Sequence, residues 1–170
     1  MKVHNGMRPH DIVVLFKILL MKESWMNKDL ATTLFISPSE ISESLNRSKI
    51  AKLISPDKKR VMKNNLLTFI ENGLSYVFPV EPGAIVLGVP TAHSASVLKQ
   101  FFSSVSNYVW ADPMGEERGQ AITPLYPNQV LAIKEDHNLY DLLALVDSIR
   151  VGRVREVEKA LDLLKIKLKE

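Results

Sequence analysis

N-K-D-L-A-T-T-L-F-I-S-P-S-E-I-S-E-S-L-N-R, residues 27–47, is the stretch from which we predict the fold. It predicts two short helices joined by a tight turn. In the first helix, Leu30, Ala31 and Leu34 form a narrow apolar stripe that a short helix can bury. Ala31 suits a steep crossing of two helices, because its small side chain lets their backbones approach closely.

The second helix of this stretch has its own start signal. Ser37 suits the N-cap, Pro38 the first helical position, and Glu40 a side-chain bond back to the cap amide. Ile41 and Leu45, four residues apart, give the helix one apolar edge. Its other faces carry short or hydrogen-bonding side chains: Ser39, Ser42, Glu43, Asn46 and Arg47. A helix that buries one edge and presents polar groups elsewhere is suited to the major groove of DNA.

The pattern L-A-x-x-L-x-I-S-P-S-E-I-S-x-x-L, residues 30–45, resembles the helix-turn-helix of bacterial winged-helix transcriptional regulators, broadly of the MarR-like kind. The resemblance implies that Ala31 is the small residue of the first helix and Ile36 the apolar turn residue. It also implies that Ser37 caps the recognition helix. One position departs from the family, since Phe35 stands where that family usually has glycine. Glycine adopts a left-handed backbone at little cost, whereas phenylalanine does not.

The resemblance implies an α+β, mainly helical fold, with a winged helix-turn-helix domain over residues 1–90. We expect residues 91–170 to form a C-terminal extension of a small β-hairpin and two or three helices, used for packing or dimerisation. The implied function is sequence-specific binding of double-stranded DNA in transcription regulation, by a homodimer. The side chains expected to contact base edges are Ser39, Ser42, Glu43 and Asn46. Glu43 suits the cytosine amino group and Asn46 suits adenine.

Positive charge is concentrated beside the second helix. Residues 47–63 hold seven lysines and arginines and one acid, Asp57, whereas the whole chain has a net charge of only +3. Cations beside a helix that enters a groove are typical of phosphate binding. A solvated loop and helix face is the other explanation of such a cluster. The residues expected to bind phosphate are Ser37, Arg47, Lys49, Lys52, Lys58, Lys59 and Arg60.

Apolar residues at helical spacing predict several further helices. Long helices are expected over residues 10–21, 61–72, 138–151 and 154–168, with shorter helical turns over residues 97–102 and 130–135. The last two long helices have more apolar surface than an isolated helical hairpin hides. They therefore either cover the winged-helix domain or pair with a second copy.

Two β-hairpins are predicted. The β-prone runs at residues 75–79 and 83–88 are expected to form the wing, whose tip carries Glu81 and no lysine or arginine. A second hairpin is expected from a strand at residues 109–111, a turn at 112–115 and a returning strand that ends near Ile122.

Composition excludes several classes of protein. A hydrophobic fraction of 46% with 24% charged residues is typical of a globular chain and not of a disordered one. The absence of cysteine excludes disulfides and thiolate chemistry. The best apolar run, residues 12–21, contains Lys17 and is too short to span a bilayer, and residues 1–7 lack the apolar core of a signal peptide. We therefore expect a cytoplasmic protein that does not bind membranes.

No motif for catalysis, a cofactor or a metal is present. The four histidines are far apart in the sequence, and none has metal-ligand spacing to another. We therefore expect neither an enzyme nor a cofactor. His93 lies among small residues, and its candidate roles are a contact with a small ligand or partner and a hydrogen-bonded structural histidine.

A second function remains open from the sequence. A winged helix also serves as a protein-interaction module, antitoxin-like or an assembly subunit, without DNA specificity of its own. The acids Glu40 and Glu43 on the second helix and the acidic tip of the expected wing favour this alternative slightly.

Overall fold

The computed structural model describes residues 5–104 and 106–169. They form an α+β fold that is mainly helical, as predicted. The chain divides into an N-terminal unit, Met1–Leu67 with Leu125–Glu135, and a C-terminal unit, Thr68–Pro124 with Asp136–Glu170. The division after residue 67 differs from the expected one after residue 90. The N-terminal unit is also discontinuous in sequence, because residues 125–135, which we call the late segment, belong to it.

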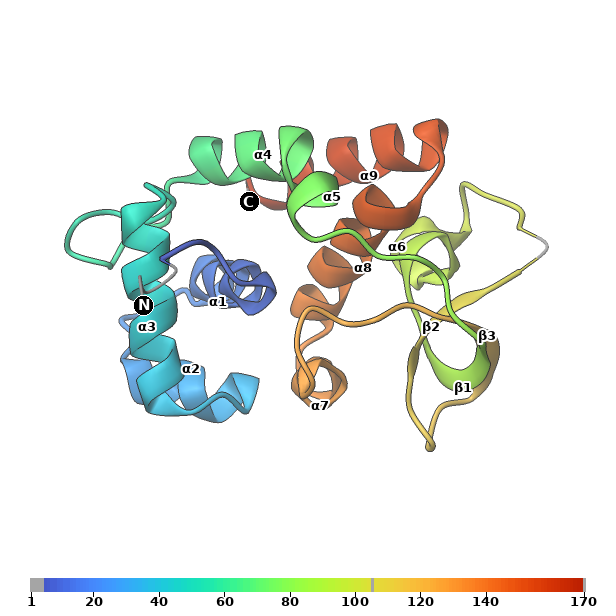
Figure 1. The fold of residues 1–170 in the computed structure, drawn as a ribbon, viewed down its shortest axis with the longest axis horizontal. Helices are drawn as coiled ribbons and strands as arrows, with labels where there is room; N and C mark the ends of the chain where they lie inside the picture. Colours follow the sequence, from blue (N-terminus) through green and yellow to red (C-terminus); the bar gives the residue numbers. More distant parts are fainter. Residues whose placement is uncertain (1–4, 105, 170) are drawn as a thin grey trace. The chain divides into compact units, whose positions relative to one another are not determined.

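The first part of the N-terminal unit contains the helices α1 (Pro9–Leu20), α2 (Asn27–Leu34) and α3 (Pro38–Ile50) (Figure 1). Their bounds lie close to those predicted from the apolar stripes. Each helix buries that stripe against the other two, and the fully buried side chains include Ile12, Leu15, Phe16, Leu30, Leu34 and Ile41. The helix pair predicted from residues 27–47 is therefore present.

The turn between α2 and α3 keeps the left-handed backbone that glycine adopts most easily. Phe35 has φ 55° and ψ 40°, and its side chain stays about half exposed. A side chain in this conformation costs roughly 1–2 kcal/mol. Two residues of the late segment bond to the turn: the Tyr126 hydroxyl donates to the Leu34 carbonyl at 2.8 Å, and the Asn128 amide donates to the Phe35 carbonyl at 2.9 Å. These bonds offset part of that cost.

The late segment continues into α7 (Gln129–Lys134), which packs against α2. A helical turn was predicted at this place in the sequence. Its position in the N-terminal unit was not, because no local pattern shows that residues 125–135 return to α2.

A short hairpin follows α3 directly. Ile54 and Val61 form an antiparallel bridge, flanked by bonds from the Ser55 amide to the Arg60 carbonyl and from the Met62 amide to the Leu53 carbonyl, both 2.8 Å. We call residues 53–62 the basic hairpin, because Lys58, Lys59 and Arg60 lie at its tip. The sequence predicted only a turn here, and the helix expected from residue 61 begins with α4 (Lys63–Asn72).

The hairpin predicted as a wing from residues 75–79 and 83–88 is wrong, because only the second of these runs forms a strand, β1 (Ile85–Pro90). Leu74–Val77 is a short helix, α5, and buries Leu74. Phe78 is buried too, with its ring against Phe69 at 6.2 Å between centroids. Leu74 and Phe78 are four residues apart, so burial here follows the helical period and not the alternation of a strand.

The second predicted hairpin is also wrong in its pairing, although its strands lie where expected. β2 (Tyr108–Ala111) and β3 (Glu117–Ala121) run parallel to each other, and each pairs antiparallel with β1 (Ile85–Pro90). The connection between β2 and β3 crosses β1 at Gly88. A Cβ on Gly115 would lie 2.5 Å from the Gly88 backbone, so this crossing requires glycine.

Helices complete the C-terminal unit. α8 (His137–Val151) and α9 (Val154–Lys167) begin and end within one residue of the prediction. α8 packs against α9 and buries an unbroken run from Leu142 to Ile149. Two short helical segments, η1 (Ala92–Ser94) and α6 (Ser96–Lys99), also pack on α8. Among residues 5–104 and 106–169, no helix is long and apolar enough to span a membrane.

Candidate functional site

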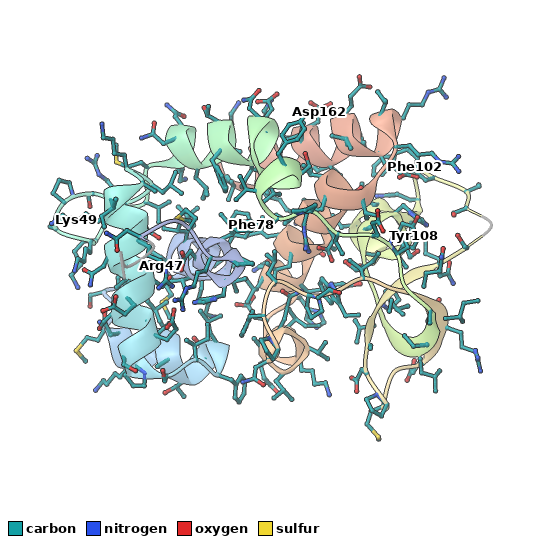
Figure 2. The ribbon with its side chains drawn as sticks, in the orientation of Figure 1. Arg47, Lys49, Phe78, Phe102, Tyr108 and Asp162 are labelled. Carbon is teal, nitrogen blue, oxygen red and sulfur yellow. The ribbon has the colours of Figure 1, made fainter. Side chains whose placement is uncertain are left out.

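A buried ion pair holds α3 against α1. Arg47 donates from Nε to Asp11 Oδ2 at 2.9 Å and from its terminal nitrogen to Asp11 Oδ1 at 2.7 Å. Asp11 is fully buried and Arg47 is 6% exposed. Figure 2 shows Arg47 on the side of α3 that faces α1, with Lys49 on the opposite side. Arg47 therefore positions α3 and does not face solvent, which corrects the expectation that it binds phosphate.

Glu40 and His10 extend this pair to the protein surface. Arg47 donates to Glu40 Oε1 at 2.6 Å, and the same oxygen lies 2.8 Å from His10 Nε2. Burial raises the pKa of Glu40, but its bonds to Arg47 and His10 outweigh that effect and hold the pKa below its usual value. The Asp11 hydrogen bonds are the main reason that the pKa of Arg47 is raised.

The start of α3 is built differently from the predicted capping box. The Ser37 hydroxyl accepts from the Glu40 amide at 3.3 Å, as expected for the N-cap. The Glu40 side chain, however, bonds to Arg47 and His10 and not back to the cap amide. Glu40 bonds to Arg47 in preference to the cap amide, because a charge-assisted hydrogen bond is stronger than a bond from a neutral amide.

The four residues expected to contact base edges share the outward face of α3. Ser39, Ser42, Glu43 and Asn46 follow one another at helical spacing, opposite a buried face that includes Ile41, Ser44, Leu45 and Ser48. Ser39 and Glu43 are exposed, and Ser42 and Asn46 are partly exposed. The helix therefore presents both hydroxyls, one carboxylate and one amide on the side away from its core.

Two of these side chains already have partners in the protein. Asn46 Oδ1 accepts a hydrogen bond from Lys58 Nζ, which joins α3 to the basic hairpin. Ser42 Oγ accepts from the Asn27 amide at 3.1 Å. Within residues 5–104 and 106–169, the Glu43 carboxylate makes no ion pair, so it faces solvent without a cation.

The tip of the basic hairpin is held by its own hydrogen bonds. The Ser55 hydroxyl donates to Asp57, whose carboxylate accepts from the Lys59 amide at 3.1 Å. The Arg60 amide donates to Ser55 Oγ at 3.0 Å. The hydrogen bond from Ser55 is the main reason that the pKa of Asp57 is lowered. These bonds fix the backbone at Lys58, which has a left-handed φ of 59°.

Four cations beside α3 are exposed: Lys49, Lys52, Lys59 and Arg60. In the part of the chain that the structure describes, none of them forms a salt bridge. Lys59 Nζ lies 4.7 Å from the centre of the Trp25 ring, which is a cation–π contact. Lys58 is only partly exposed and bonds to Asn46. Of the cations expected to bind phosphate, these four are therefore exposed, whereas Arg47 and Lys58 bond to other side chains of the protein.

His93 belongs to the C-terminal unit and is 5% exposed. Its Nε2 bonds to the Ser106 carbonyl oxygen at 2.9 Å, and its ring lies 4.6 Å from that of Tyr108. Its other ring nitrogen has no hydrogen-bond partner and lies 3.9 Å from a Glu156 carboxylate oxygen. This packing fits a structural histidine, and the ligand contact stays a prediction.

The described residues contain no group of three or more histidine, aspartate and glutamate side chains placed to hold a metal.

The sequence did not predict the ion pair between Asp11 and Arg47. Asp11 stands at the start of α1, where an acid also serves as a cap: its carboxylate accepts from the Arg8 amide at 2.8 Å. The local sequence therefore predicts that Asp11 caps α1, but it does not predict that Asp11 pairs with Arg47, 36 residues later.

Comparison with family models, curated proteins and solved structures gives no match to this chain. The resemblance to winged-helix regulators therefore rests on the sequence of residues 30–45 and stays a prediction.

Proposed function

We propose that this chain is a sequence-specific DNA-binding transcriptional regulator that places α3 in the major groove of a duplex. One observation carries the proposal: α3 buries one face, presents Ser39, Ser42, Glu43 and Asn46 on the other, and is flanked by four exposed cations without salt bridges. Short polar side chains suit base edges, and unpaired cations suit phosphates.

The contacts divide between two classes of partner atom. Glu43 accepts from a cytosine amino group, and Ser39, Ser42 and Asn46 contact neighbouring base edges. Lys49, Lys52, Lys59 and Arg60 bind phosphates and fix the register of α3, with Ser37 at the helix N-terminus. Arg47 contributes indirectly, because its bonds to Asp11 keep α3 in place on α1.

In this proposal the basic hairpin acts as the wing. It follows α3 directly, its tip is rigid and cationic, and Lys58 joins it to α3 through Asn46. The acidic residue Glu81 is not part of it. The proposal also includes a homodimer in the cytoplasm, acting without a cofactor and without enzymatic activity. Two copies of α3 would then contact half-sites about 10 base pairs apart.

The test is a gel shift with the full chain and the DNA upstream of its own gene, over a series of salt concentrations, after retention on heparin has been measured. We expect retention at low salt and a binding constant that falls steeply with salt. The matched variants are Lys49→Met, at an exposed cation, and Lys99→Met, at a cation of the C-terminal unit. The first should weaken binding and the second should not. Equal effects, or no retention of the wild type, would refute the proposal.

A second candidate function is a protein-interaction module. The observation that favours it is exposed apolar surface near α2 and α3: Met26 is 54% exposed, Phe35 49% and Ile50 60%. Substituting Ile50→Ser separates the two functions. A regulator should keep its DNA affinity within about twofold, because a lone exposed apolar side chain contributes little there. A docking module should lose the protein that co-purifies with it.

A further inference from the structure

The hydrogen bond between Asn46 and Lys58 fixes which way the Asn46 amide faces. A lysine ammonium donates and cannot accept, so the Asn46 atom that faces Lys58 Nζ is the oxygen Oδ1. The nitrogen Nδ2 is then the group left for another partner, and it makes no hydrogen bond within residues 5–104 and 106–169. Asn46 therefore offers a donor outward, while its oxygen points toward Lys58 and uses one of its two lone pairs there.

This orientation changes the base that Asn46 suits. A bidentate pair with adenine needs Nδ2 to donate to N7 and Oδ1 to accept from the amino group at N6. Guanine presents two acceptors, N7 and O6, and suits two donors. The Asn46 amide and the Lys58 ammonium, which keeps two further N–H groups, form such a pair of donors.

We propose that Asn46 and Lys58 act together as a donor pair that selects guanine, and not adenine, at the base beneath them. This inference rests on the proposed function, since it names the base that the α3 surface prefers. It gives Lys58, which the sequence placed among the phosphate-binding residues, a role in determining specificity.

The backbone of the basic hairpin supports the pair before any DNA binds. Lys58 has a left-handed φ of 59°, and its amide donates to the Ser55 carbonyl at 2.8 Å. Bonds from Ser55 and to Asp57 close the tip around it. A side chain held in this way loses less conformational freedom when it binds.

Glu43 completes the pattern on the same face of α3. It lies three residues before Asn46 and is exposed, with a carboxylate that only accepts. In a G·C pair the cytosine amino group lies beside guanine O6 in the major groove. Donors from Asn46 and Lys58 next to an acceptor from Glu43 therefore match a G·C pair or a step that contains one.

The experiment selects bound duplexes from a randomised library with the full chain and sequences them. Asn46→Ala first locates the base position that depends on Asn46. Lys58→Met then removes the donor and frees Asn46 Oδ1, whereas Lys59→Met removes the same charge from the neighbouring residue, which contacts Trp25 and not Asn46. Both variants should lose affinity and salt dependence to a similar extent.

The two lysine variants should differ in the base that they prefer at the Asn46 position. We expect the wild type and Lys59→Met to prefer guanine over adenine about tenfold at the Asn46 position, and Lys58→Met to lose that preference or reverse it toward adenine. A wild type that prefers adenine there, or a Lys58→Met preference equal to that of Lys59→Met, overturns the inference while DNA recognition stands. Wild-type protein that enriches no sequence refutes the proposed function itself.

A second variant covers the possibility that Lys58→Met disturbs the hairpin. Asn46→Asp keeps an oxygen for Lys58 and adds a charge pair, but it has no amide to donate. It should fold as the wild type does and lose the guanine preference. Guanine selection that survives Asn46→Asp also overturns the inference.

Discussion

Each unit of this protein contains a buried arginine–aspartate pair, and the two pairs have different structural roles. In the N-terminal unit, Arg47 and Asp11 come from different helices and join α3 to α1. In the C-terminal unit, Asp147 and Arg150 stand three residues apart on α8. The first pair sets the position of a surface helix, whereas the second binds irregular segments to a central one.

The partners of Asp147 and Arg150 show this second role. Asp147 Oδ2 accepts from the Thr91 hydroxyl at 2.9 Å and from the Trp110 indole at 2.6 Å. Arg150 donates to the backbone carbonyls of Phe78 at 2.9 Å and Thr123 at 3.1 Å. Four segments that are distant in sequence therefore meet at one ion pair. The comparison shows that a buried charge pair by itself does not identify a functional site.

The largest expected effect is the loss of stability when Asp147 is substituted. Asp147→Ala leaves the Trp110 indole without its acceptor and the Arg150 guanidinium without its anionic partner inside the core, which should lower the unfolding free energy of the C-terminal unit by about 3–5 kcal/mol. The measurement is urea denaturation followed by tryptophan fluorescence in a Trp25→Phe background. The chain has two tryptophans, so Trp110 then reports alone.

Asp147→Asn is the matched control, since it keeps an acceptor for Trp110 and Thr91 but removes the charge. Burial raises the pKa of Asp147, and the bonds to Arg150, Thr91 and Trp110 lower it less. We therefore expect Asp147→Asn to be less destabilising than Asp147→Ala. Equal losses would show that the hydrogen bonds to Thr91 and Trp110 contribute nothing.

The next effect concerns the pair in the N-terminal unit. Arg47→Met leaves the Asp11 carboxylate buried without its main partner and should destabilise α1 and α3 by about 3 kcal/mol. The double variant Asp11→Leu with Arg47→Met replaces the pair by apolar side chains and should recover most of that loss. Hydrogen exchange of the amides in residues 9–20 and 38–50 measures both.

The same double variant also tests the corrected role of Arg47. Because Arg47 faces Asp11 and not solvent, the double variant should bind DNA with the same salt dependence as the wild type. A decrease of the slope by about one unit would show that Arg47 binds a phosphate after all.

Local sequence patterns predicted much of the helical fold, because each helix carries its own start, stop and apolar stripe. The bounds of α1, α8 and α9 were predicted to within one residue at each end. The left-handed backbone at Phe35 was not predicted, because phenylalanine disfavours that conformation. The strands at residues 108–121 were also placed correctly. Their pairing was not, since strand direction depends on the Gly88–Gly115 crossing, which no local pattern shows.

For the candidate site, the sequence predicted which residues of α3 share a face, but not the contacts that they make with other segments. The face formed by Ser39, Ser42, Glu43 and Asn46 follows from helical periodicity alone. Contacts over longer distances could not be predicted: Arg47 with Asp11, Lys58 with Asn46 and the return of residues 125–135 to α2. Charge in the sequence does not show whether a cation is paired inside the protein.

A smaller effect distinguishes the exposed cations from one another. Lys49→Met, Lys52→Met and Arg60→Met should each lower the slope of log binding constant against log salt concentration by about one unit, if each residue binds one phosphate. Thermal stability should stay within about 0.5 kcal/mol of the wild type, because these side chains have no salt bridge to lose. Isothermal titration or anisotropy with a labelled duplex measures the slope. A variant with an unchanged slope identifies a cation that lies off the DNA.

The smallest expected effect is the pH dependence that Glu40 contributes. Burial raises the pKa of Glu40 but its bonds to Arg47 and His10 lower it further, so the folded pKa lies below the usual 4.5. A lowered folded pKa means that the unfolded chain binds protons first; the stabilisation is therefore complete above about pH 4.5 and is lost as the pH falls through the folded value. Glu40→Gln should remove this dependence, so the stability difference between wild type and variant should be larger at pH 6 than at pH 3. The other acids titrate in both proteins and cancel in that comparison. A difference that does not change with pH would show that Glu40 stabilises α3 through packing alone, and that Asp11 is the sole ionic partner that holds Arg47.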